Sequence, residues 1–98
     1  MATIEIRRTH ALTQPDLRTR AEELAKSMEA KLGIRWKWEN DARIGFDAPS
    51  GAAKGTKGSV QLTDTSVVVA IDLPFLLRAL KGTIEGKVNA KLDDVFNR

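Results

Sequence analysis

Apolar and polar residues alternate at the start of the chain and then settle into a helical repeat. In the segment 3–8, two isoleucines alternate with charged residues, a pattern typical of a strand with one buried face. From 14 to 32 the apolar residues recur every three or four positions and form one stripe. The members of this stripe are Leu17, Ala21, Leu24, Ala25, Met28 and Leu32. The pattern predicts a strand followed by a helix over 14–32.

Both ends of this helix carry signals in the sequence. Thr13 stands three residues before Asp16, with Pro15 in the first turn, which predicts a variant of the capping box with Asp in place of Glu. Gly33 follows the apolar stripe directly and predicts a left-handed C-terminal cap. The helix is therefore expected to end where the next alternating segment begins.

Four further strands are predicted between this helix and residue 71. They contain Ile34, Trp36 and Trp38, then Ile44 and Phe46 (42–47), then Val60 and Leu62, and finally the run 67–71. Because 67–71 is apolar on both faces, we expect a central strand or one partly covered on its second side. Gly51, Gly55 and Gly58 predict a flexible loop between the second and third of these strands.

A long second helix is predicted from 73 to about 97, with Asp72 as its cap and Pro74 in its first turn. Its stripe contains Leu73, Leu76, Leu77, Leu80, Ile84, Val88, Leu92, Val95 and Phe96. Such a helix would extend about 37 Å, whereas a strand of six residues spans about 20 Å. We therefore expect Leu92, Val95 and Phe96 to lack cover within the chain and to form an interaction surface, for a second copy, a lipid-like surface or the end of the first helix.

Two glycines interrupt this second helix. Gly82 and Gly86 each cost about 1 kcal/mol relative to alanine inside a helix, so the pair implies close packing against a neighbour or a kink. We expect a bend or break near Gly82 and Thr83, which would let the final segment turn along the sheet.

The predicted order β-α-β-β-β-β-α indicates an α+β fold in one domain over 1–98. Consecutive strands with short turns form an antiparallel meander, and the first strand must join the same sheet to pair its backbone. Both helices can bury their stripes only on the apolar face of that sheet. The prediction is a five-stranded antiparallel curved sheet with two helices on one face, of the TATA-binding-protein-like or helix-grip type. A ferredoxin-like sheet is the alternative, but it requires two β-α-β units.

Composition narrows the functional classes. Hydrophobic residues make up 42% and charged residues 30% of the chain, as in a folded protein. The absence of cysteine excludes disulfides, thiolate nucleophiles and Cys-based zinc sites. No apolar run approaches the roughly 18–20 residues of a membrane span, and the N-terminus lacks an apolar signal region, so a cytoplasmic location is expected. A net charge of +3 with interspersed acids permits nucleic acid as a partner without arguing for it.

Little in the sequence suggests catalysis. His10, the only histidine, is either a general base assisted by Arg8 and a carboxylate such as Asp72, or a polar residue that satisfies loop backbone groups. We prefer the second interpretation because no nucleophile accompanies the histidine. The segment 51–58 lacks the ending and the following helix of a phosphate-binding loop. We expect no enzyme activity, catalytic residues, cofactor or metal site.

Three binding surfaces remain open. Trp36 and Trp38 could stack a base or a ligand, but they share parity with Ile34, so we expect them in the core. The opposite strand face mixes bases with acids, which makes nucleic acid an unlikely partner; its residues are Arg7, Arg35, Lys37, Arg43, Glu5, Glu39 and Asp47. A helix-grip fold could also carry a hydrophobic acyl ligand in a cavity lined by Trp36, Trp38, Phe46 and Leu80.

Several segments together resemble the polyhydroxyalkanoic acid system family, small bacterial proteins of the polyhydroxyalkanoate granule region. They are IEIRRTHAL, the first helix up to Gly33, RWKWE, ALKGTIEGKV and KLDDVF, which cover nearly the whole chain in order. Arg7, Arg8, His10 and Leu12 match the opening motif, and Leu80, Lys81, Gly82, Ile84 and Glu85 match the helix motif. The resemblance implies a non-enzymatic accessory or granule-associated protein of storage-polyester metabolism. The partners that the resemblance implies are the granule surface or other granule proteins. The apolar end of the C-terminal helix separately suggests a homodimer.

Overall fold

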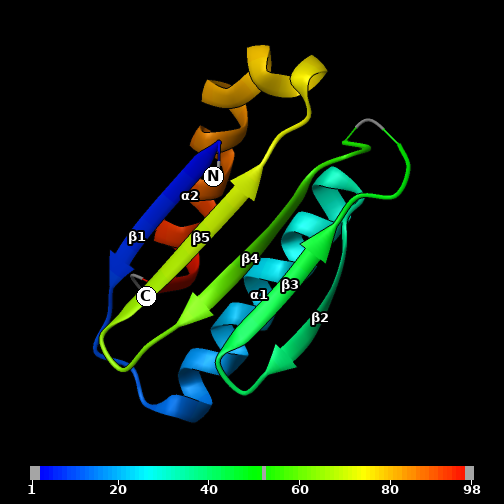
Figure 1. The fold of residues 1–98 in the computed structure, drawn as a ribbon. Coiled ribbons are helices and arrows are strands. Elements are labelled where there is room, and N and C mark those ends of the chain that lie inside the picture. The colour runs from blue at the N-terminus through cyan, green and yellow to red at the C-terminus, as the bar shows by residue number, and fades with distance from the viewer. Residues whose placement is uncertain (1–2, 52, 97–98) are drawn as a thin grey trace.

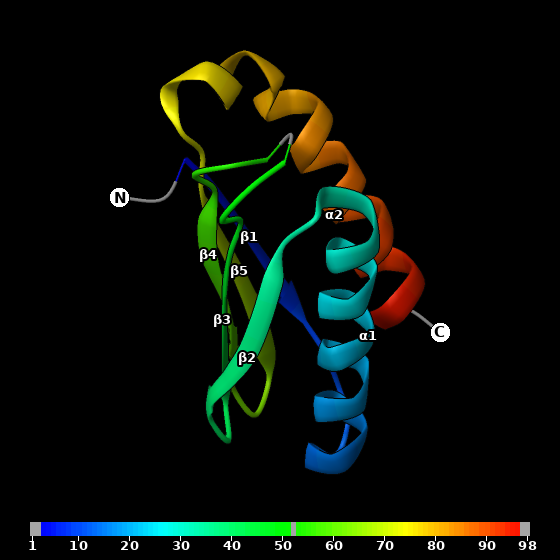
Figure 2. The same cartoon turned by 90° about the vertical axis from the view of Figure 1, so that its right-hand side faces the viewer.

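The computed structural model describes residues 3–51 and 53–96, and shows a five-stranded antiparallel sheet with its helices on one face (Figures 1 and 2). The elements are β1 (Ile4–Thr9), α1 (Gln14–Leu32), β2 (Arg35–Asn40), β3 (Arg43–Asp47), β4 (Lys57–Leu62), β5 (Ser66–Asp72), the 3-10 helix η1 (Phe75–Leu80) and α2 (Lys81–Phe96). The strand order in the sheet is β1-β5-β4-β3-β2. The predicted α+β class, strand order and placement of both helices on one face are confirmed.

Strand alternation sets which side chains face the helices. Ile4 pairs with Ile71 and Ile6 with Val69, and all four are buried on the helix side. β5 lies between β1 and β4, as the apolar run at 67–71 predicted for a central strand. The core is therefore the space between one sheet face and the two helices.

The first helix spans its predicted range, but the capping interaction predicted at its N-terminus is not formed. Gly33 has φ 70° and its N–H donates to the carbonyl oxygen of Glu29, which confirms the left-handed cap. The capping box is wrong, because the side chain of Thr13 makes no capping hydrogen bond. Thr13 takes part in the start of the helix through its backbone, because its carbonyl oxygen accepts the first helical hydrogen bond from the N–H of Leu17.

The final segment is divided, not continuous. β5 runs through Asp72, Pro74 precedes η1, and the change from 3-10 to α geometry falls between Leu80 and Lys81, just before the predicted break at Gly82. Figure 2 shows the chain turning there and α2 running down beside α1. With 16 residues, α2 extends about 24 Å, which matches the length of the sheet.

Because α2 fits its sheet, the predicted uncovered end does not exist. Leu92, Val95 and Phe96 are 1%, 0% and 8% exposed and belong to the core. The guanidinium of Arg20 on α1 donates to the carbonyl oxygen of Val95, which ties the end of α2 to the first helix. Of the three covers expected for these side chains, the structure supplies the first helix, and their burial contradicts an exposed surface for a second copy or a lipid-like phase.

Gly82 and Gly86 have no packing role within the described residues. Both are exposed, and a Cβ at either position would meet no atom within 4 Å, so close packing against a neighbour does not explain them. We expect Gly86→Ala to raise the free energy of unfolding by about 0.5–1 kcal/mol, since alanine has less backbone freedom to lose. Urea denaturation measures the change.

Gly33→Ala is the matched control for this prediction. The positive φ of Gly33 is strained for alanine, so that variant is expected to lose stability. A loss of stability in Gly86→Ala would contradict the exposed, unhindered position seen for Gly86.

Candidate interaction surface

The structure exposes three large apolar side chains in one short segment, η1. Phe75, Leu76 and Leu80 are 80%, 86% and 49% exposed, and they are the exposed large hydrophobic residues among the described parts of the chain. We call these three residues the apolar tip. Figures 1 and 2 place η1 beyond the end of β5, where the chain crosses toward α2. A cluster of this kind usually marks a contact with a partner or an apolar phase.

Contacts of the neighbouring residues fix the position of the apolar tip relative to the core. Leu73 is buried, its N–H donates to Thr3 Oγ1 at 3.1 Å, and Leu77 is partly buried against the core. The N–H of Leu77 donates to the carbonyl oxygen of Pro74 at 2.9 Å. The loop before β4 also reaches this point, because an added Cβ on Gly55 would lie 3.2 Å from Pro74 Cβ. The apolar tip is therefore anchored by its own segment and by a neighbouring loop.

His10 serves the backbone, as the preferred interpretation predicted. Its Nδ1 accepts from the N–H of Leu12 at 3.1 Å, and its Nε2 lies 2.9 Å from the carbonyl oxygen of Thr63. Nδ1 as acceptor requires the proton on Nε2, which then donates to that carbonyl. Both ring nitrogens are thereby used to join the corner after β1 to the turn between β4 and β5.

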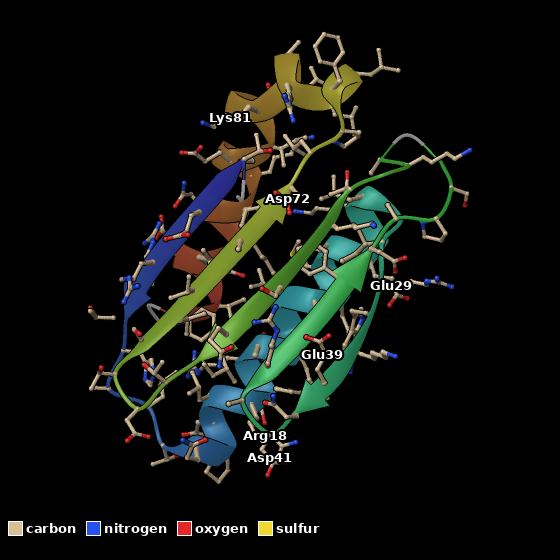
Figure 3. The ribbon with its side chains drawn as sticks, viewed as in Figure 1. Arg18, Glu29, Glu39, Asp41, Asp72 and Lys81 are labelled. Carbon is tan, nitrogen blue, oxygen red and sulfur yellow. The ribbon has the colours of Figure 1, made fainter. Side chains whose placement is uncertain are left out.

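The groups that could have assisted His10 lie elsewhere. Arg8 faces the helices and donates to Asp93 and to Asn89 Oδ1 on α2. Asp72 ends β5 at the opposite end of its pairing with β1 (Figure 3), seven residues or about 23 Å along the strand from Thr65, whose carbonyl oxygen accepts the N–H of His10. The structure does not bring the proposed base and its assistants together.

The tryptophans lie on the helix side of the sheet but are only half-buried, because β2 is an edge strand. Trp38 Nε1 donates to Glu22 Oε1 at 2.8 Å, and the guanidinium carbon of Arg18 lies 4.9 Å from the ring centroid. Trp36 stands opposite Phe46 in the β2–β3 register. Trp38 is thus held beside α1, and both rings pack at the border of the core, not in its interior.

Of the four residues predicted to line an acyl cavity, Trp36, Trp38 and Phe46 lie on the neighbouring strands β2 and β3, and Leu80 lies apart from them in η1. Leu80 belongs to the apolar tip, and Phe46 is buried against Gly58. A hollow of about 610 Å³ includes Trp36 and Phe46 but opens among charged residues of the outer sheet face; its other lining residues are Arg35, Lys37, Glu39, Gly45, Asp47, Lys57 and Gly58. This lining does not suit a hydrophobic acyl chain.

Charges on the outer face largely compensate one another. Arg35 Nε lies 2.9 Å from Asp47 Oδ1, and Arg43 Nε lies 2.7 Å from Glu39 Oε1. The hydrogen bond from Arg35 is the main cause that holds the pKa of Asp47 below its ordinary value. Since both groups of that pair are exposed, solvent screening keeps its contribution to stability small. The face is mixed in charge and solvated, as predicted, and is not a basic platform.

Other site types receive no support from residues 3–51 and 53–96. That part of the chain contains no cluster of three His, Asp or Glu side chains placed to hold a metal ion. In the same residues, neither helix has the length and apolar character needed to cross a bilayer.

Fold and surface together define a small α+β protein that presents an anchored apolar tip. The chain belongs to the polyhydroxyalkanoic acid system protein family, whose family model matches residues 4–96. That range includes the apolar tip and begins and ends in the elements that build the core, so the resemblance noted from the sequence is confirmed over the whole fold. No curated protein matches the chain.

Sequence reasoning missed all three residues of the apolar tip as surface residues. Phe75 falls outside the predicted helical stripe, and Leu76 and Leu80 fall within it. A signal was present, because Pro74 directly precedes a run of five apolar residues among six, more than one face of a short helix can bury.

Proposed function

We propose that this protein is a non-enzymatic accessory protein of polyhydroxyalkanoate storage metabolism that attaches to the polyester granule through the apolar tip. The observation that carries the proposal is the exposure of Phe75, Leu76 and Leu80 in a member of this family. Removing such a side chain from water is worth about 1.5–3 kcal/mol, so three of them supply enough free energy for reversible attachment.

The chemistry of the polyester suits this tip. Its repeating units are uncharged esters with alkyl groups, so they bind apolar side chains by burial of surface and not by ion pairing. The anchoring contacts of Leu73 and Leu77 support the proposal, because a segment that is already ordered loses less conformational entropy on binding.

Co-sedimentation with protein-free polyhydroxyalkanoate granules tests the proposal. We expect the double variant Phe75→Ser with Leu76→Ser to bind at least about tenfold more weakly than the parent, equivalent to about 1.4 kcal/mol. The matched control, Lys26→Ser with Glu29→Ser, replaces exposed residues of α1 and is expected to bind like the parent.

Two outcomes contradict the proposal. One is undiminished granule binding by the tip variant with an unchanged thermal midpoint. The other is a parent that is dimeric in sedimentation equilibrium and becomes monomeric in the tip variant, because the apolar tip would then be covered by a second copy of the chain.

A further inference from the structure

We infer that the surface that the apolar tip meets is anionic, and that cations beside the tip recognise lipid headgroups at that surface. This inference rests on the proposed attachment through the tip and adds the class of molecule that the tip encounters. Two separate arrangements of charge carry it, one within the tip segment and one on the adjoining helices.

The tip segment itself contains no acid. From 73 to 84 there are two basic residues, Arg78 and Lys81, and no aspartate or glutamate, so the segment carries +2. Both basic residues are exposed, and Figure 3 shows Lys81 at the start of α2, directly after the segment that bears the tip. The nearest acids in the sequence, Asp72 and Glu85, lie outside this stretch. Exposed apolar residues interspersed with cations are typical of segments that lie in a lipid interface.

α2, which follows the tip segment, and α1, which packs against α2, carry further cations. Lys31, Lys87 and Lys91 border a narrow crevice between α1 and α2, whose other lining residues are Ser27, Met28, Leu32 and Val88. Lys91 pairs with Asp94 at 3.2 Å, whereas Lys31 and Lys87 make no ion pair within the described residues. Lys31 lies in the last turn of α1, which Figure 2 shows beside the upper part of α2. Lys87 follows Lys81 by six residues, or about 9 Å along the helix.

A neutral polyester offers these cations no partner. An anionic lipid surface does, at about 1 kcal/mol for each Lys or Arg close to it. Four cations, Arg78, Lys81, Lys31 and Lys87, therefore add a contribution comparable to that of the apolar side chains. Charge complementarity and continuity with the apolar tip favour an anionic lipid layer as the occupant.

Vesicle binding tests the inference directly. We expect the full chain to bind vesicles with 30% phosphatidylglycerol at least about tenfold more tightly than pure phosphatidylcholine vesicles, and to lose that preference in 0.5 M salt, where screening is strong. The variant Lys31→Glu with Lys81→Glu and Lys87→Glu is expected to abolish the preference. A matched control with three charge reversals on other surfaces, Arg7→Glu with Lys26→Glu and Lys37→Glu, is expected to retain it.

The outcomes separate this inference from the proposed function. If the tip variant loses binding to protein-free polyester but the parent shows no preference between the two vesicles, attachment stands and the anionic surface is wrong. If the reversal and control variants lose vesicle binding equally, the effect is one of net charge and the assigned cations are wrong. If the parent instead binds DNA in a salt-sensitive way that needs these lysines but neither Phe75 nor Leu76, the occupant is a polyanion and the inference is overturned.

Discussion

Replacing Leu92 by alanine is expected to lower the free energy of unfolding by about 2–5 kcal/mol, the usual range for a leucine removed from a close-packed core. Leu92 is among the largest fully buried side chains and is 1% exposed. Leu76→Ala makes the same chemical change at a side chain that is 86% exposed, and is expected to change stability by less than about 0.5 kcal/mol. Urea denaturation followed by the fluorescence of the two tryptophans measures both variants.

The contrast between these two leucines tests where α2 lies. Equal losses, or a larger loss at Leu76, would contradict the docking of α2 against α1 and the sheet. The result also decides which residues can be substituted to test function. A charged residue at position 92 would unfold the protein, so a loss of granule binding in that variant would not identify the binding surface. Granule binding is therefore best tested at the apolar tip.

The elements predicted correctly from the sequence are those whose hydrophobic residues follow one period and indicate one position in the fold. The stripe of α1 and the alternation of β1, β3 and β4 each point to a single buried face, the apolar run of β5 points to a central strand, and Gly33 has a local conformational reason for ending α1. The topology followed because an unpaired first strand and two one-sided helices leave few arrangements of a single sheet. These are properties of short segments and of simple packing rules.

The prediction of one continuous helix from 73 to about 97 was wrong for a physical reason. Leucines at 73, 76, 77 and 80 fit an α stripe, and over six residues a period of 3.6 is scarcely distinguishable from the 3.0 of a 3-10 helix. Which leucines are covered depends on where the chain turns relative to the sheet, and a one-dimensional pattern does not contain that turn. An unbroken helix would outrun the sheet, which led to the prediction that Leu92 is uncovered. In the structure the chain turns at η1, so Leu92 is buried and Leu76 is exposed.

The sequence also does not identify polar contacts between residues that are far apart in the chain. Arg8 occupies an inward parity with Ile4 and Ile6, a position that signals a partner on the helix side. Its partners Asn89 and Asp93 lie more than eighty residues away in the chain, and only the path of α2 along β1 brings them near. The sequence could indicate that Arg8 needs a partner but not which residue provides it.

Gly58→Ala is expected to lower the free energy of unfolding by about 1–3 kcal/mol, as overpacking of a well-filled site does. A Cβ at this position would lie 2.3 Å from the carbonyl oxygen of Ala70 and 2.4 Å from Cζ of Phe46. The carbonyl belongs to β5, which pairs with β4 along its length, and the phenyl ring is buried. Neither neighbour can withdraw without disturbing the sheet or the core.

Gly45→Ala is the control because it makes the same substitution on the adjacent strand. Its nearest obstacle is the carboxyl carbon of Glu39 at 2.8 Å, which is the end of a flexible, exposed side chain. That side chain can rotate away at the expense of an exposed ion pair, so we expect a change within about 0.5 kcal/mol. Both variants reduce the backbone freedom of the unfolded chain alike, and their difference in urea midpoint therefore reports the contact of β4 with β5 and Phe46. Equal stability of the two variants would contradict the close approach of Ala70 and Phe46 to Gly58.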